Sequence, residues 1–515
     1  MKKSLGIAAS LALVWSGQPA QAELLKNLRL SGQLDIQATS ANNIADFSTR
    51  ATADSPPGNV PAGIRTNNND RIGDTQTRVM LHLDWDLLDD VHSRITLRKS
   101  DRTWGTTGGT TAAGTGQTLT ATGGSNVLGN VVVDEAHVKI DKVAGQVDLT
   151  LGRQSYGSSG DLIIYYGPSD KAWYGMPVTA LDSARADWNN EWLGVTGVAG
   201  KVTGHPIGLA GAVSDIDVTG MNIALKGNEN YSGATYVYNQ MTHNVGASGA
   251  PPSNVPSAGG KADMLYVAGL KMKLAGAGFW WRGEYAQDFG DNRISPANTN
   301  IAPASHYDGY AFLTNLGYKY ESESAGMASV WGEYGLGSGR QNSRENQNDG
   351  FVAINSDYRP GSIYGRFAAN AVTGVSLGMN VANQAGALPA GSPVVNTGAN
   401  GAAGLSNRQI WGGGVRYSPG FANKLVAAVS FWDYRLDRFT NVPNGTNALQ
   451  GNKHIGSELD VDFIWTHSEN VAFATGWGTF QPGGLIKEAN RAASPSGGLG
   501  TNPASMVYFD TRIKF

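Results

Sequence analysis

The last nine residues of the chain, from Val507 to Phe515, carry the pattern that most restricts the fold. One set of alternate positions is mainly apolar: Val507, Phe509, Thr511, Ile513 and Phe515. The positions between them hold a tyrosine and three charged residues: Tyr508, Asp510, Arg512 and Lys514. Because successive side chains of a strand point to opposite faces, this alternation predicts a β-strand between an apolar and a polar environment.

The opposite end of the chain has the pattern of a secretory signal peptide. Lys2 and Lys3 form a positive region, residues 5–15 an apolar region, and Ala20-Gln21-Ala22 a small-residue cleavage site. We expect residues 1–22 to be removed, which leaves residues 23–515 as a single domain. The apolar run is too short for a spanning helix and ends in Gly17 and Pro19.

The composition narrows the class of an exported protein further. The chain has no Cys, which excludes disulfides, thiolate metal sites and covalently attached haem, and we expect no cofactor. Its formal net charge of −3 argues against nucleic acid as a partner. No stretch after residue 22 approaches the roughly 20 apolar residues that a spanning helix needs. Abundant glycine, 69 of 515 residues, and alternating strands instead fit a transmembrane β-barrel with a wet interior.

Alternating stretches recur along the chain and predict an all-β antiparallel barrel. Residues 28–38 form the clearest early strand, which we expect to pair with the C-terminal strand and close the barrel. The long polar stretch 40–74 predicts an extracellular loop, and residues 77–98 predict a hairpin with a short periplasmic turn at 87–90. Residues 136–151 predict another hairpin with its turn at 141–145. The Gly-rich stretch 105–129 predicts a loop that either stays flexible or folds into the lumen.

Two resemblances make the barrel more specific. The C-terminal strand resembles that of outer-membrane proteins, which implies that Phe515 is an assembly signal read by the barrel-assembly machinery. Several motifs also follow one another in the order found in the alginate-export family of outer-membrane barrels: residues 135–138 (EAHV), 151–154 (LGRQ), 166–170 (YGPSD), 181–186 (LDSARA), 308–311 (DGYA), 334–339 (YGLGSG), 357–361 (DYRPG), 454–460 (HIGSELD) and 476–483 (GWGTFQPG). This resemblance implies about 18 strands, within a range of roughly 16–20, in the outer membrane of a Gram-negative bacterium.

The candidate functional residues are charged side chains on the polar faces of these strands. Alternation points Arg94, Arg98, Lys139, Glu135 and Arg282 into the lumen, where guanidinium groups would attract carboxylates. The resemblance implies that Arg153 and Arg185 line the constriction. The other interpretation is that each Arg braces the wall by pairing with a neighbouring Asp or Glu. Inward carboxylates of the last third, such as Asp460 and Asp462, predict a lumen of mixed charge, unlike the basic lumen of the family.

These observations predict a porin-like channel that gives passive passage to a hydrophilic solute, carbohydrate or anionic, in contact with outer-membrane lipid. We expect no enzyme, since no pairing of nucleophile and base is visible and the eight His are scattered. A barrel hydrolase, a plugged structural or adhesive barrel, and a sheath around a partner's electron-transfer conduit remain alternatives.

Overall fold

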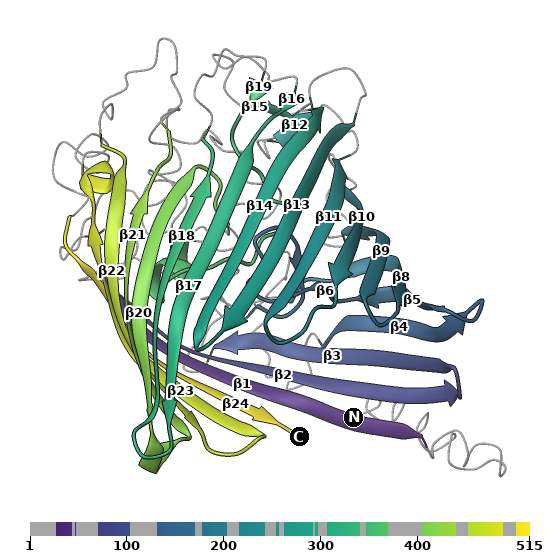
Figure 1. The fold of residues 1–515 in the computed structure, drawn as a ribbon, viewed down its shortest axis with the longest axis horizontal. Coiled ribbons are helices and arrows are strands. Elements are labelled where there is room, and N and C mark those ends of the chain that lie inside the picture. Colours follow the sequence, from purple (N-terminus) through teal and green to yellow (C-terminus); the bar gives the residue numbers. More distant parts are fainter. Residues whose placement is uncertain are drawn as a thin grey trace, which may run out of the picture.

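The protein is a closed antiparallel β-barrel of 18 strands (Figure 1), as the sequence predicted. The computed structural model describes residues 27–43, 47, 71–103, 131–169, 178–202, 216–242, 254–256, 262–291, 294–296, 306–339, 347–368, 404–438, 452–487 and 501–515. The barrel strands are β1 Leu28–Asn42, β2 Arg71–Leu88, β3 Val91–Thr103, β4 Val132–Val143, β5 Val147–Gln154, β8 Leu181–Asn189, β9 Leu193–Val202, β10 Ile216–Leu225, β11 Tyr231–Thr242, β13 Asp263–Gly276, β14 Phe279–Asp291, β17 Tyr310–Ser322, β18 Gly326–Gly337, β20 Arg408–Pro419, β21 Leu425–Arg435, β22 His454–Thr466, β23 Val471–Pro482 and β24 Ala504–Lys514.

The remaining elements are short. Two small antiparallel pairs join β6 Tyr156–Gly157 to β7 Tyr165–Tyr166 and β12 Asn254–Pro256 to β15 Ile294–Pro296. The bridges β16 His306–Tyr307 and β19 Gln347–Asn348 pair in parallel. Two single helical turns are η1 Tyr364–Ala368 and η2 Gly420–Ala422. Across the described ranges, no helix combines the length and apolar character needed to cross a membrane.

The barrel closes where the first strand meets the last, as predicted. β24 pairs antiparallel with β1 over ten residue pairs, from Gln33–Lys514 to Asn42–Ser505. Phe515 extends this ladder: its N–H donates to the Gly32 carbonyl at 3.0 Å, and the Gly32 N–H donates to the Phe515 carbonyl at 2.8 Å. A Cβ on Gly32 would lie only 2.5 Å from Cζ of Phe515. Only glycine therefore leaves room for the terminal ring against β1.

The connections differ in length at the two ends of the barrel. At one end, which also holds the start of β1 and the end of β24, short turns such as 89–90 and 144–146 join consecutive strands. We call this the short-turn end; the long connections lie at the other. Both predicted hairpins are present, but their turns begin later than expected, because β2 runs to Leu88 and β4 to Val143; Gly145 supplies the positive φ (+83°) of the second turn. The predicted loop 40–74 is too long, because β1 continues to Asn42 and β2 already begins at Arg71.

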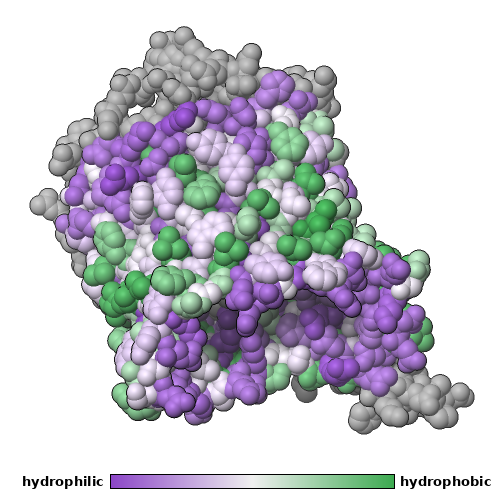
Figure 2. Space-filling view, viewed as in Figure 1, coloured by the Kyte–Doolittle hydropathy of each residue, from purple (hydrophilic) through white to green (hydrophobic). Residues whose placement is uncertain are grey.

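The outer surface of the barrel is apolar. On β24, Val507 and Phe509 are about half exposed, whereas Met506 and Tyr508, which point inward, are buried. The same alternation exposes large apolar side chains on many strands, among them Leu30, Ile95, Leu151, Leu270, Leu316, Val415, Phe431 and Trp477. Figure 2 shows such side chains gathered in a band across one face, below a hydrophilic upper rim. A soluble protein would bury these residues; a barrel in lipid exposes them.

The buried core lies inside the barrel. Residues 155–169 follow β5 and residues 349–366 lie between β18 and β20; we call them the first and second inner segments. They pair with each other, since the Asn355 N–H donates to the Ile163 carbonyl at 2.9 Å and Tyr165 N–H donates to the Asn355 carbonyl at 2.8 Å. Their apolar side chains pack with inward residues of the wall in one buried cluster that includes Leu162, Ile163, Phe351, Ile363, Tyr236, Val267 and Tyr434.

Three sequence-based expectations fall on residues outside the described ranges. These are the signal peptide 1–22, most of the loop 40–74 and the Gly-rich stretch 105–129. Each stays a prediction.

Candidate functional site

The predicted lumen residues of β3 and β4 lie on the inner face, and each is paired with a neighbour. Nε of Arg94 donates to Oδ1 of Asp84 at 2.6 Å, and Nζ of Lys139 lies 2.6 Å from Oδ1 of Asp141 and 3.1 Å from Oδ2 of Asp148. Their side chains stay more than 40% exposed, so they face open lumen. These pairs therefore brace the wall and still present charge to the pore.

Arg98 and Glu135 lie deeper. Nε of Arg98 donates to Oδ2 of Asp134 at 2.6 Å, with both side chains nearly inaccessible to solvent. Glu135 accepts hydrogen bonds from Oγ1 of Thr96 and Oγ of Ser155, each at 2.7 Å. Glu135 thereby fixes the start of the first inner segment to the wall. These residues act as structural contacts between wall and segment.

Arg185 and Arg153, which the family resemblance implied at the constriction, lie in different places. Arg185 faces inward: Nη2 donates to Oδ1 of Asp187 at 3.0 Å, and the guanidinium lies 5.9 Å from the centre of the Tyr156 ring.

Arg153 instead contacts Asp182, at 3.5 Å between Nη1 and Oδ1. Along β8, Leu181 and Ser183 are buried and Asp182 is exposed, which places Asp182 on the outer face. Arg153 is in register with exposed Ala136 and follows exposed Leu151 by two residues. Its side chain therefore lies on the outer surface near the long-loop end. The LGRQ motif at 151–154 led to the expectation that Arg153 lines the constriction, but the motif does not determine which face of β5 the side chain occupies.

The inner segments are held in the lumen by buried wall carboxylates. Glu458 on β22 accepts from the backbone N–H groups of Ser362, Ile363 and Tyr364 at 2.5–3.0 Å. Asp288 on β14 accepts from the Val352 N–H at 2.6 Å. A carboxylate that receives several backbone N–H bonds makes strong, charge-assisted contacts. These acids fix the second inner segment to the inner face of the wall.

Further contacts tie the two inner segments together and to the wall. Asp357 of the second segment accepts from the Gly160 N–H at 3.0 Å and from Oγ of Ser159 at 3.1 Å. Lys271 on β13 donates to Asp161 of the first segment. Tyr358 donates its hydroxyl to Glu333 on β18. Burial and the adjacent Glu333 carboxylate raise the pKa of Tyr358 well above its usual value, so the phenol stays a donor.

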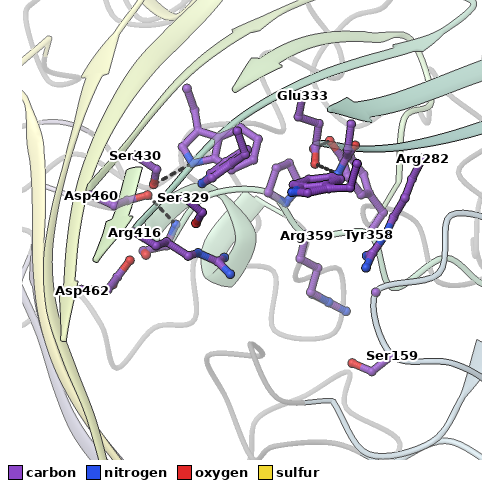
Figure 3. Close-up of a pocket in the computed structure, with 18 of the residues that line it drawn as sticks. Ser159, Arg282, Ser329, Glu333, Tyr358, Arg359, Arg416, Ser430, Asp460 and Asp462 are labelled. Atoms are coloured by element: carbon purple, nitrogen blue, oxygen red, sulfur yellow. Dashed lines mark hydrogen bonds between the residues drawn. The ribbon is translucent and has the colours of Figure 1, made fainter. Parts of the chain in front are cut away.

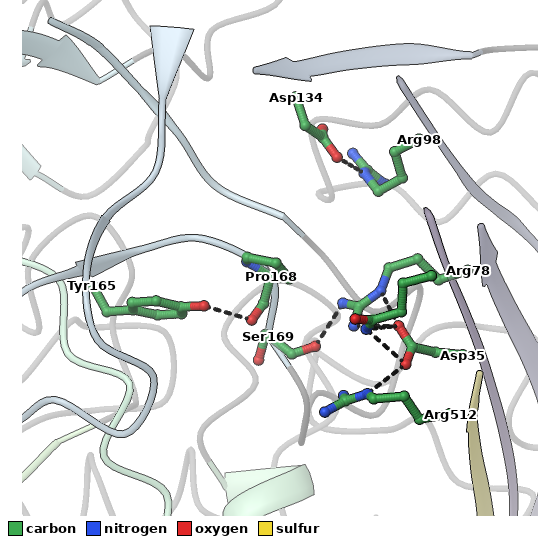
Figure 4. Close-up of polar contacts among 9 residues, drawn as sticks. Asp35, Arg78, Arg98, Asp134, Tyr165, Pro168, Ser169 and Arg512 are labelled. Carbon is green, nitrogen blue, oxygen red and sulfur yellow. Dashed lines mark hydrogen bonds and ion pairs between the residues drawn. The ribbon is translucent and has the colours of Figure 1, made fainter. Parts of the chain in front are cut away.

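A second anchor lies at the closure of the barrel. Asp35 on β1 is in register with Arg78 on β2 and Arg512 on β24, and it binds both (Figure 4). Nε and Nη2 of Arg78 donate to Oδ2 of Asp35 at 2.9 and 2.7 Å, while Nη1 donates to the Ser169 carbonyl at 2.9 Å. Arg78 is completely buried. One buried guanidinium thus links the barrel closure to the end of the first inner segment.

A cavity of about 630 Å³ lies on the short-turn side of the second inner segment (Figure 3). Residues 357–362 of the inner segment form one wall of it, together with inward residues of β14, β17, β18 and β20–β22. Arg282, predicted as a lumen residue, lines this cavity, with its guanidinium 5.6 Å from the Trp280 ring. Its other lining side chains include Trp331, Glu333, Tyr358, Arg359, Arg416, Trp432, Asp460 and Asp462.

Sequence reasoning missed most of this cavity. Asp460 and Asp462 are expected to face inward from the sequence, but their partners cannot be read from it: Asp460 accepts from the Ser362 N–H of the second inner segment, and Asp462 accepts from Tyr508 on β24. Trp331 and Trp432 were not predicted as lumen residues, although they sit on the polar side of strands whose other face is exposed. An aromatic residue at an inward position is the signal that could have found them.

Ser338, in the Gly-rich motif 334–339, has a structural role. Oγ of Ser338 donates to the Asp349 carbonyl at 2.6 Å and accepts from the Tyr310 N–H at 2.9 Å. Ser338 therefore links the second inner segment to β17. Within the described residues, no group of three or more metal-ligating side chains is gathered.

Comparison with solved structures places the fold among bacterial barrels. The chain is similar to Acinetobacter baumannii OccAB2, with a TM-score of 0.50 and 8% identity over 95% of this chain and 98% of that one. It is also similar to Pseudomonas aeruginosa OpdQ (TM-score 0.47, 11% identity, 96% and 99% covered) and to the outer membrane channel DcaP of A. baumannii (0.41, 9%, 95% and 97%). No family model matches the sequence, and no curated protein matches it. The similarity to OccAB2 supports the barrel fold alone.

Proposed function

We propose that the protein is a passive channel in the outer membrane of a Gram-negative bacterium, for a hydrophilic solute that is anionic or a carbohydrate. The observation that carries this proposal is the combination of an apolar outer surface with a lumen that holds charged side chains and a cavity of about 630 Å³. Lipid requires the first feature, and the passage of a polar solute requires the second.

The lumen holds charged side chains of both signs, which bears on the solutes that the channel would select. Arg94, Lys139 and Arg185 present positive charge, but each is accompanied by an aspartate. Such a lumen differs from the basic channel that the alginate-export resemblance implies. A polyuronate is therefore a more specific version of the proposed solute. The mixed charge of the lumen favours a small anion or a sugar instead.

The proposal includes the route to the membrane. Cleavage after Ala22 would release the barrel into the periplasm, and the C-terminal strand ending in Phe515 would be recognised by the barrel-assembly machinery. Both termini would then lie at the periplasmic side, together with the short turns. The mass of the mature protein purified from outer membranes measures the cleavage site directly.

Planar-bilayer recording of the purified protein tests the channel. We expect step-like conductance, with an anion-to-cation permeability ratio measured in a salt gradient. A barrel that inserts, resists SDS without boiling and yet conducts no ions would instead be a plugged structural barrel. A barrel hydrolase would also conduct no ions, but it would hydrolyse ester or lipid substrates.

A further inference from the structure

Two carboxyl groups of β22 lie together behind the second inner segment and share one backbone donor. The Ser362 nitrogen lies 2.7 Å from Oε1 of Glu458 and 3.1 Å from Oδ2 of Asp460. Both acidic residues are only 1% exposed, and their carboxyl groups are within hydrogen-bond reach of each other. Among the residues that the structure describes, no basic side chain forms an ion pair with either of them.

Glu458 has the surroundings of an ionised carboxylate. Besides the Ser362 N–H, it accepts from the Ile363 N–H at 2.5 Å, from the Tyr364 N–H at 3.0 Å and from the Tyr434 hydroxyl at 3.0 Å. Hydrogen bonds from several donors stabilise the charged form of a carboxyl group. Glu458 can therefore stay negative although no cation pairs with it.

Asp460 has no comparable support. In the described part of the chain, its one donor is the Ser362 N–H, and its Oδ1 is buried without a hydrogen-bond partner. A Cβ on Gly478 would lie 2.7 Å from this Oδ1, so the backbone of β23 closes the site on that side. A negative charge on Asp460 would thus lie beside Glu458 with nothing to offset it.

The other charged and titratable groups around the pair are bound elsewhere. They are Tyr364 with Arg408, Asp462 with Tyr508, Arg366 with Asp510, and Arg359 with Asp357. Arg416 lines the same cavity, but its register through Ala428 places it in the row of Asp462. Within the described ranges, then, no cation is paired with Glu458 or Asp460.

Two carboxyl groups that share a donor in a site closed to water cannot both be ionised, because the second charge is repelled by the first and has no solvent around it. We propose that Glu458 and Asp460 share one proton, carried by Asp460, and that this proton keeps the second inner segment on the wall.

The proton gives the contact a defined dependence on pH. As pH rises, Asp460 releases the proton to water and becomes a second carboxylate beside Glu458. The two charges repel each other, and the backbone N–H groups of residues 362–364 lose their fixed acceptors. The segment is therefore held in acid and loosens in alkali. The effect on conductance rests on the proposed channel function, whereas the shared proton does not.

Hydrogen exchange of the full-length protein in detergent tests the shared proton without any need for conductance. We would measure protection factors, which correct for the intrinsic effect of pH on exchange, for the N–H groups of residues 362–364 from about pH 5 to pH 10. We expect their protection to fall at least about tenfold as pH rises, while the ladder between β1 and β24 keeps its protection.

Variants assign the effect to the pair. Asp460→Asn keeps the shape of a neutral carboxyl group and should hold the segment at every pH. Glu458→Gln should loosen it at every pH, because the N–H groups lose their anion. Asp462→Asn is the matched control: Asp462 lies two residues further along β22 and binds Tyr508, so the pH-dependent loss of protection should persist.

Constant protection in the wild-type protein, or a pH-dependent loss that survives in Asp460→Asn, would overturn the proposal. If Asp460→Asn does not assemble, Asp460→Ser takes its place, because it also removes the second charge and should abolish the dependence on pH.

Bilayer recording distinguishes this inference from the proposed channel. Conductance and its fluctuations should rise with pH in the wild-type protein and stay low in Asp460→Asn. A protein whose segment loosens in alkali but which conducts no ions keeps the shared proton and loses the channel. A protein that conducts ions while its protection is independent of pH keeps the channel and loses the shared proton.

Discussion

Arg512 on the last strand and Asp35 on the first face each other across the closure of the barrel, with Nε of Arg512 2.8 Å from Oδ1 of Asp35. Asp35 is almost fully buried and also binds Arg78, which has no exposed surface at all. The three residues occupy one row of the sheet, because Asp35 is in register with both arginines. One carboxylate therefore binds two guanidinium groups where the first and last strands meet.

Asp35→Asn should destabilise the barrel. The substitution keeps the shape of the side chain but removes the carboxylate charge that Asp35 presents to the buried Arg78, and breaking a buried ion pair typically costs about 3–5 kcal/mol. Unfolding in urea, followed by the loss of heat-modifiable migration in SDS gels, measures the change.

Asp86→Asn is the control for this prediction, because Asp86 pairs with the exposed Arg29 and the partly exposed His92, and we expect its loss to change the stability by less than about 1 kcal/mol. Equal stability of the two variants would mean that the ion pairs of Asp35 with Arg78 and Arg512 add nothing to the stability that the backbone hydrogen bonds between β1 and β24 provide.

Glu458→Gln should loosen the second inner segment. The amide keeps one oxygen for the backbone N–H groups of residues 362–364 and brings an NH₂ group against other donors. Losing charge-assisted bonds of this kind costs about 2 kcal/mol, and the freed segment should raise single-channel conductance and its fluctuations. Glu321→Gln, at an exposed pair with Lys319, serves as the control. Identical conductance in both variants would show that the segment does not set the width of the pore.

The closure and the hairpins could be predicted from the sequence because alternation is a local property. Apolar and polar side chains alternate with a period of two in residues 507–515 and 28–38. The two faces of each strand can therefore be identified without knowing what packs against them. The turns at 87–90 and 141–145 follow from short breaks in this pattern. The strand number follows from the family resemblance, because alternation alone does not fix the number of strands.

The interior of the barrel was not predictable in the same way. Residues 351–367 belong to the second inner segment and η1 and form no barrel strand. Their conformation is fixed by Glu458 and Asp288 through bonds between residues distant in the chain. Arg153 shows the related problem for a single side chain. Gly152 before it has φ +119°, and nothing in a list of residue types reveals which face such a backbone presents.

Phe515→Ala should impair assembly without changing the selectivity of the barrels that insert. The ring is more than half exposed on the outer surface and lies next to Gly32, so it contributes contacts outside the lumen. Gly32→Leu should have a similar effect, because its side chain would collide with the ring. Outer-membrane yield, compared with bilayer recordings of the surviving protein, separates the two properties. Altered ion selectivity in Phe515→Ala would contradict the outward placement of the ring.

Arg185→Ser and Arg153→Ser form a matched pair that tests how the lumen discriminates ions. Arg185 faces the lumen beside Asp187, so its removal both deletes a positive charge and leaves a carboxylate unpaired. A unit charge about 4 Å from an ion is worth roughly 1 kcal/mol even in water, so the anion-to-cation permeability ratio should fall by a factor of about two to five. Arg153 contacts Asp182 on the outer surface, and its loss should leave the ratio unchanged. Reversal potentials in a salt gradient measure both variants. If Arg153→Ser changes the ratio as much as Arg185→Ser does, the side chain of Arg153 reaches the pore and the register argument is wrong. If neither changes it, Arg185 only braces the wall.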